Sequence, residues 1–260
     1  MAYKPYPQVV LFGDSLFQGC SQIQEGFSFQ GALQHHCVRV FDVINRGLSG
    51  YNTKNALEVF PDMFLPPSSS NPSIEYLLVL LGANDACLPI PTCTQGVPID
   101  QYKANLVKII THDLIKAHNP KILLITPPPL DEIRTRKDDL KSDSHGQPCR
   151  KAAVNAEYSE VVRKVASEVP GVVVLVDLYE ALMKRAVSLT KESNPSWHPS
   201  GRPPLGYPEG QRGGLEQLLT DGLHMSGEAY RVLFDLVKDH IKPDSKTPPF
   251  KDWREMNAPH

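Results

Sequence analysis

Short apolar runs rich in β-branched residues recur along the chain, and glycine, proline, asparagine or aspartate bounds each run. Runs of this kind are typical of β-strands that end in turns. Three of them, residues 9–12, 77–81 and 172–176, are continuously apolar, which favours a parallel sheet covered on both faces. The pattern predicts five strands, over residues 8–12, 38–45, 75–81, 121–126 and 172–177.

Amphipathic stretches with helical spacing fill the intervals between these runs. Pro98 favours a helix start, Asn119-Pro120 favours a stop, and Ser226 can cap the last helix. The apolar stripes are interpreted as faces packed on the core. Strands that alternate with helices predict the α/β class, as a doubly wound sandwich. The helices are expected over residues 99–118, 152–169, 177–189 and 227–241.

Two connections exceed the usual loop length, and both can be either solvated surface or a rim or lid over a site. Residues 127–148 are dense in mixed charges, and residues 193–214 are rich in proline and glycine and include Trp197 and Tyr207. We expect one domain over residues 1–242. A C-terminal extension, 243–260, would pack on that domain or on a neighbouring subunit.

Composition narrows the class of protein. A chain of 260 residues suits one large domain, and the formal net charge of −2 gives no basis for binding nucleic acid. No apolar run reaches the roughly 18 residues of a membrane span, and residues 1–7 lack the apolar segment of a secretory signal. An odd number of cysteines, five, fits a reducing compartment. A cytoplasmic protein without stable membrane insertion is therefore expected.

Four polar motifs follow one another along the chain, at residues 13–16, 45–50, 82–85 and 221–224. Ser15 comes just past the carboxyl end of the first strand, where open α/β sheets bind ligands. Asp221 lies three residues before His224, so its carboxylate can reach Nδ1–H and leave Nε2 facing a nucleophile. The motifs predict Ser15 as nucleophile, His224 as base and Asp221 as the group that orients it. Taken alone, Ser15 also suits a helix cap, and the Asp221–His224 pair suits a surface ion pair.

An oxyanion needs hydrogen-bond donors that are in place before the reaction. The predicted donors are the Ser15 N–H, the Gly50 N–H and the side-chain amide of Asn84. Gly50 follows the second strand and Asn84 follows the third. Each also has a structural alternative, Gly50 as a turn residue and Asn84 with Asp85 as a helix cap. Catalysis is favoured because three strand ends each deliver one part of the same site.

With these motifs the chain resembles the SGNH (GDSL-type) hydrolases, whose hallmark residues match Ser15, Gly50, Asn84 and His224. Residues 45–53, 82–86, 125–129 and 221–226 are similar to the isoamyl acetate-hydrolysing esterases within that superfamily. The resemblance implies a flavodoxin-like, three-layer α/β/α fold with a mostly parallel five-stranded sheet. It also implies hydrolysis of small acetate esters without a cofactor. The stretch 193–214 is longer than in that family, which leaves the shape of the pocket open.

No metal site is expected, because no Cys-x-x-Cys or His-x-x-x-His pairing accompanies Cys87 and Cys93. A classical α/β-hydrolase would show Gly-x-Ser-x-Gly, and residues 26–30 fail at the last position. Phosphate-binding glycine motifs are absent as well. A non-catalytic binding protein, a lipase, a thioesterase and a carbohydrate O-deacetylase remain alternatives to an esterase for a small-molecule ester. The sequence leaves open whether the chain forms a homo-oligomer.

Overall fold

A single parallel sheet organises the chain. The computed structural model describes residues 5–68, 70–141, 145–169, 171, 173–190, 205–243 and 256. The strands are β1 (Gln8–Gly13), β2 (Asp42–Gly47), β3 (Ile74–Leu80), β4 (Lys121–Ile125) and β5 (Val173–Val176). All pair in parallel, in the order β2-β1-β3-β4-β5. This is the flavodoxin-like doubly wound order, whose switch point lies between β1 and β3. The predicted α/β class is confirmed.

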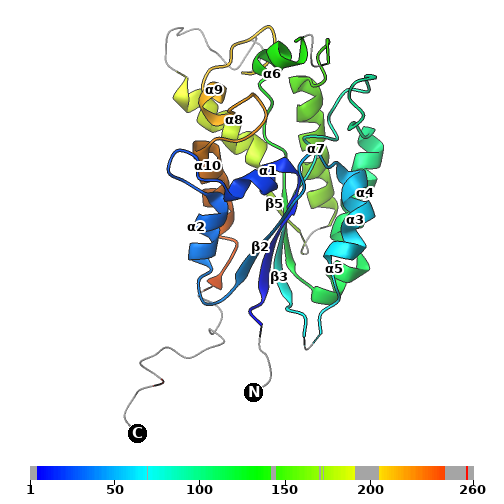
Figure 1. Ribbon diagram of the computed structural model, residues 1–260, viewed down its shortest axis with the longest axis vertical. Coiled ribbons are helices and arrows are strands. Elements are labelled where there is room, and N and C mark those ends of the chain that lie inside the picture. Colours follow the sequence, from blue (N-terminus) through cyan, green and yellow to red (C-terminus); the bar gives the residue numbers. More distant parts are fainter. Residues whose placement is uncertain are drawn as a thin grey trace.

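Helices cover both faces of the sheet (Figure 1). One layer holds α1 (Ser15–Gln18), η1 (Gly19–Ser21), α2 (Phe29–His36), α8 (Leu178–Leu189), α9 (Leu215–Leu218) and α10 (Gly227–Lys238). The other holds α3 (Thr53–Met63), α4 (Ile99–Ile110), α5 (Asp113–His118) and α7 (Ala152–Glu168). A further helix, α6 (Glu132–Asp139), lies beyond the carboxyl ends of the strands, at the top of the view. Among the described helices, none has the length and apolar character that a membrane span requires.

The core is divided by the sheet into two layers of apolar side chains. Val9 and Leu11 of β1 belong to one cluster, whereas Val10 and Phe12 belong to the other. Successive side chains of a strand point to opposite faces, so a continuously apolar strand supplies both clusters at once. All four are at most 2% exposed. The interpretation of the apolar runs as strands covered on both faces is confirmed for β1 and β3. It is wrong for β5, which lies at the edge of the sheet and leaves Leu175 36% exposed.

Several predicted elements differ from the structure, most clearly the second strand and the helix expected over 99–118. The second strand begins at Asp42 rather than at residue 38, because the chain turns after α2 and the N–H groups of Val40 and Phe41 donate to Cys37 O. The helix expected over 99–118 is broken into α4 and α5. At the break His112 has an extended backbone, and its Nδ1 accepts from Leu114 N–H as the cap of α5.

The interpretation of residues 127–148 as a loop is wrong for Glu132–Asp139, which form α6. Asp131 caps this helix, since its Oδ1 accepts the N–H of Arg134 at 3.1 Å. Part of the second long connection, including Trp197, lies outside the described residues. So do Phe250 and Trp253 of the expected C-terminal extension.

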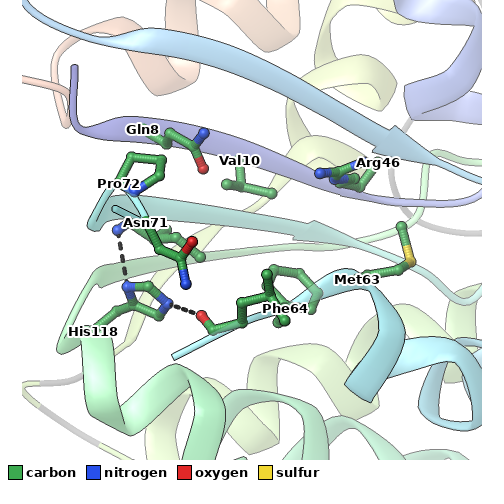
Figure 2. Close-up of a pocket in the computed structure, with 10 residues that line it drawn as sticks. Gln8, Val10, Arg46, Met63, Phe64, Asn71, Pro72 and His118 are labelled. Carbon is green, nitrogen blue, oxygen red and sulfur yellow. Dashed lines mark hydrogen bonds between the residues drawn. The ribbon is translucent and has the colours of Figure 1, made fainter. Parts of the chain in front are cut away.

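A histidine fastens the connection between α3 and β3 to the end of α5. His118 Nδ1 accepts from Ile74 N–H at 3.1 Å, and its Nε2 lies 2.8 Å from Leu65 O. Because Nδ1 accepts, the proton of the neutral ring is on Nε2, which donates to Leu65. Figure 2 shows both hydrogen bonds at the edge of a hollow that Phe64 and Asn71 also line.

Replacing this histidine is expected to destabilise the fold. His118→Ala removes both hydrogen bonds and should lower the free energy of unfolding by about 1–3 kcal/mol. Urea denaturation monitored by circular dichroism measures the change. His35→Ala is the matched control, because His35 is an exposed helical histidine on α2. Equal stability of the two variants would contradict the fastening role of His118.

Candidate active site

The structure brings together Ser15, His224 and Asp221. Ser15 Oγ lies 3.0 Å from His224 Nε2, although 209 residues separate them, and His224 Nδ1 lies 2.6 Å from Asp221 Oδ2. The other carboxylate oxygen, Oδ1, accepts the N–H groups of Leu223 and His224 at 2.9 and 2.8 Å. With Nδ1–H donating to Asp221, Nε2 is the atom free to accept the hydroxyl proton of Ser15.

Ser15 is held at the carboxyl end of β1 by the turn into α1. A Cβ on Gly13 would lie 2.4 Å from Leu80 O, so only glycine allows β1 and β3 to approach this closely here. Asp14 caps α1, since its Oδ1 accepts from Leu16 N–H at 2.9 Å. The capping role that the sequence left open for Ser15 is therefore filled by Asp14, and the serine hydroxyl is directed to His224.

His224 is held over Ser15 by the docking of α10. Ser226 caps this helix by accepting from Ala229 N–H at 3.3 Å. One turn later, the buried Tyr230 hydroxyl donates to Leu16 O at 2.6 Å. A hydrogen bond thus joins the helix that follows the histidine to the residue that follows the serine.

Gly50 occupies a tight turn after β2. Tyr51 N–H donates to Leu48 O at 3.1 Å, and Gly50 has a φ of +81°. A positive φ at the third residue of such a turn is characteristic of type II and favours glycine. The side chain of Gln95 fixes the turn, because its Nε2 donates to Gly50 O at 2.8 Å.

The side-chain amide of Asn84 is oriented by partners on both of its atoms. Its Nδ2 donates to Tyr51 O at 2.9 Å, and its Oδ1 accepts from Arg150 Nη2 at 3.2 Å. Since an amide nitrogen carries two hydrogens, one N–H remains for another acceptor. Asn84 is only 4% exposed, so this donor lies in a poorly solvated position.

Ser15, Gly50, Asn84, Asp221 and His224 line one pocket of about 300 Å³. The rest of its described wall is mostly polar, with Leu223 as the one apolar side chain among the described lining residues. Helix α6 supplies part of this wall, so part of segment 127–148 forms a side of the pocket. The remaining lining residues are Ser49, Gln95, Thr135, Asp138, Asp139, Arg150 and Leu223.

The pKa values of Asp221 and His224 are shifted in opposite directions. Burial by itself would raise the pKa of Asp221, but hydrogen bonds from the His224 ring and from two N–H groups outweigh it and hold the pKa well below 3.8. The hydrogen bond to Asp221 raises the pKa of His224 above 6.5, against the opposing effect of burial. The nearby Asp14 also raises it, whereas Arg150 lowers it.

A second carboxyl group lies beneath the site. Asp14 is fully buried, and its Oδ2 has no hydrogen-bond partner in the described structure. Burial raises its pKa to about 7, because an ionised carboxylate is poorly solvated there. At neutral pH this group therefore carries a fractional rather than a full negative charge.

A mixed cluster beside the pocket contains metal-ligand residue types. One ligand atom each from Asp139, His145 and Cys149 lies within 4.8 Å of the others. Both Asp139 oxygens already accept from Cys149, through its N–H at 2.8 Å and its thiol at 3.3 Å. Burial raises the pKa of the Cys149 thiol to about 12, so the sulfur is kept in its protonated form. We therefore assign no metal to this cluster.

Sequence reasoning missed three groups that contribute to the site. Gln95 and Arg150 hold Gly50 and Asn84, and Thr135 of α6 forms part of the wall. Gln95 and Arg150 lie outside the four motifs, in segments without a recognisable pattern. Only the folded chain shows what they contact.

Comparisons with known proteins identify the family of the chain. A model of the GDSL-like lipase/acylhydrolase family matches residues 11–202, more than half of the chain, and ends before Asp221. The isoamyl acetate-hydrolyzing esterase of Saccharomyces cerevisiae is 27% identical over 96% of this chain and 95% of its own length. A GDSL esterase/lipase of Arabidopsis thaliana is 32% identical over 89% of this chain and 84% of its own.

Solved structures support the fold. The crystal structure of an acetyl xylan esterase superposes with a TM-score of 0.61 at 20% identity, covering 90% of this chain and 99% of that one. The fold and the family match thus point to the same family. The chain belongs to the GDSL-like lipase/acylhydrolase family, and it is a carboxylic ester hydrolase of the SGNH type.

Proposed function

We propose that this protein is a serine esterase that hydrolyses small, acetate-type carboxylic esters through an acyl-enzyme on Ser15. The observation that carries the proposal is the continuous chain of hydrogen bonds from Ser15 Oγ through His224 to Asp221, at 3.0 and 2.6 Å. The name of the yeast relative, an isoamyl acetate-hydrolyzing esterase, supports acetate as the acyl group.

The first half of the reaction forms the acyl-enzyme. His224 Nε2 removes the Ser15 proton while Oγ attacks the acyl carbon. The negative oxygen of the tetrahedral intermediate accepts hydrogen bonds from Ser15 N–H, Gly50 N–H and the remaining Asn84 N–H. Asp221 stabilises the imidazolium that forms. His224 then gives its proton to the departing alcohol.

The second half returns the enzyme to its starting state. Water takes the position of the alcohol, and His224 removes one of its protons as the oxygen attacks the acyl carbon. The same donors hold the second oxyanion. Ser15 Oγ leaves with the proton from His224, and the carboxylic acid is released.

A carbohydrate O-deacetylase is the second candidate, because the described wall of the pocket is polar. Thr135, Asp138 and Gln95 surround the space next to the catalytic pair and offer hydrogen-bonding partners to a hydroxylated alcohol. The small volume, about 300 Å³, favours a short acyl group in either case. Lipase and thioesterase activity, both of which use longer chains or larger carriers, are less well matched by such a pocket.

Substrate profiling tests the proposal. We expect nitrophenyl acetate to have a kcat/KM at least about tenfold above that of the octanoate and palmitate esters, since the polar lining of the pocket favours a short acyl chain. Isoamyl acetate and a monoacetylated xylose, compared at equal concentration, separate the two candidate alcohols. Mass spectrometry after treatment with a serine-directed phosphonate should show one adduct, on Ser15. An adduct elsewhere, or a preference for palmitate, contradicts the proposal.

Substitutions in the proposed machinery should lower kcat to different extents. Ser15→Ala is expected to lower it by about 10⁴-fold or more, and Asn84→Ala by about 10²–10³-fold through the loss of one oxyanion donor. Stopped assays with nitrophenyl acetate measure both. Ser68→Ala is a matched control, because Ser68 is exposed and remote from the pocket lining. A wild-type kcat in Asn84→Ala would remove Asn84 from the proposed oxyanion hole.

The pH dependence should follow His224. The base works only when it is neutral, so kcat/KM falls as the pH drops through its pKa. An unperturbed histidine would give a midpoint within about pH 6–7. Because the pKa of His224 is raised, the midpoint of this acid limb should lie above pH 6.5. Asp221→Asn removes the main cause and should move the ring titration, followed by NMR, to lower pH. An acid limb below 6.5 in the wild type would contradict this assignment.

A further inference from the structure

Arg150 lies directly behind one of the proposed oxyanion donors. Its Nη2 donates to Asn84 Oδ1 at 3.2 Å, on the side of the amide opposite the hydrogens. An amide whose oxygen is already occupied by a guanidinium cannot flip without losing that charge-assisted hydrogen bond. The contact therefore keeps Asn84 Nδ2, rather than Oδ1, directed toward Tyr51 and the pocket.

The arginine is itself held by the surrounding structure. Arg150 lies just before α7. On each side of it, a carboxylate of α6 accepts a backbone N–H of the chain. Glu132 accepts the N–H of Ala152 at 2.9 Å, and Asp139 accepts the N–H of Cys149 at 2.8 Å. Both carboxylates are less than a tenth exposed. The guanidinium makes a further contact through Nη1 with Cys149 Sγ at 3.4 Å.

The charge of Arg150 has no carboxylate partner within ion-pair distance among the described residues. Its Nε is buried without a hydrogen-bond partner, and the groups that its terminal nitrogens contact are an amide oxygen and a thiol. A guanidinium stays protonated at any pH the enzyme meets. The site thus contains a fixed positive charge next to the place where the oxyanion forms, with the Asp139 carboxylate near enough to act on it but outside ion-pair distance.

We propose that Arg150 is a positioning residue that fixes and polarises the Asn84 amide as an oxyanion donor. This inference rests on the proposed esterase mechanism and extends it by one residue. A guanidinium on Oδ1 draws electron density from the amide, which makes the remaining Nδ2–H a stronger donor. Because the oxyanion exists only in the transition state and the tetrahedral intermediate, the contribution should appear in kcat rather than in KM.

The pH profile supplies an independent readout. The charged and titratable groups that act on His224 are Asp221 and Asp14, which raise its pKa, and Arg150, which lowers it. Asp138 and Asp139 also line the pocket. Removal of the Arg150 charge should therefore shift the acid limb of kcat/KM to higher pH. This shift reports the Arg150 charge near His224, whereas the coupling of Arg150 to Asn84 is measured through kcat.

The test is a double-mutant cycle on the full chain with nitrophenyl acetate. Arg150→Met should lower kcat by about 10–100-fold, part of the value of a whole oxyanion donor, with KM changed by less than about threefold. In an Asn84→Ala background the same substitution should lower kcat by less than about threefold, because the amide on which Arg150 acts is absent. Arg150→Lys keeps the charge, so its acid limb should match the wild type, and it should recover part of kcat.

A matched control and a stability measurement separate positioning from misfolding. Arg185→Met removes an arginine that pairs with Glu228 at the surface, and its kcat should stay within about twofold of wild type. Circular dichroism and thermal unfolding check that each variant folds. If Arg150→Met does not fold, Arg150→Lys replaces it in the double-mutant cycle. Its kcat loss should be smaller, and it should again disappear in the Asn84→Ala background.

The outcomes separate this inference from the proposed function. Equal kcat losses from Arg150→Met with and without Asn84 would overturn the positioning role while leaving the esterase mechanism intact. Unchanged kcat with a raised KM would also overturn it, because Arg150 would then bind substrate directly. A wild-type kcat in Asn84→Ala would instead refute the oxyanion role of Asn84, and the inference with it.

Discussion

The hydrogen bond between Ser15 Oγ and His224 Nε2 is the contact on which the site depends, and it joins parts of the chain 209 residues apart. Neither residue is placed by its own neighbours alone. Ser15 follows a strand that is buried from Val9 onward, whereas His224 lies in a loop that α10 follows. The buried hydrogen bond from Tyr230 to Leu16 O connects the two elements. The packing of a helix therefore determines whether His224 reaches Ser15.

The groups proposed to hold the oxyanion form a second, partly buried network. Tyr51 O accepts from Asn84, Gln95 binds Gly50 O, and Asn52 Nδ2 donates to Gln95 O at 2.7 Å. Gly50 and Asn84 are thus linked through the backbone between them rather than placed independently. Donors fixed in a poorly solvated region need little reorganisation when negative charge develops, which is the physical basis of oxyanion stabilisation.

Two carboxyl groups close to Ser15 and His224 have pKa values shifted in opposite directions, because their surroundings differ. Asp221 accepts three hydrogen bonds and remains ionised, whereas Asp14 is buried with one oxygen unpartnered and has its pKa raised to about 7. An ionised Asp221 orients His224 and stabilises its protonated form. A partly neutral Asp14 limits the total negative charge beneath Ser15, where a second full carboxylate would oppose formation of the oxyanion.

Local sequence determined the strands, most helices and the order of the four motifs, because these depend on spacing, turns and caps within a few residues. It was sufficient to predict that Ser15, Gly50, Asn84, Asp221 and His224 would meet in one pocket, while their catalytic roles stay a prediction. Tertiary packing decided what local patterns leave ambiguous: the break at His112, the helix at Glu132–Asp139 and the contact of Arg150 with Asn84. The break and the helix begin at local caps, but Phe60 also packs on His112 and Arg212 binds Asp131. Arg150 lies 66 positions from Asn84. Contacts over tens of positions are fixed only when the sheet and its helices pack.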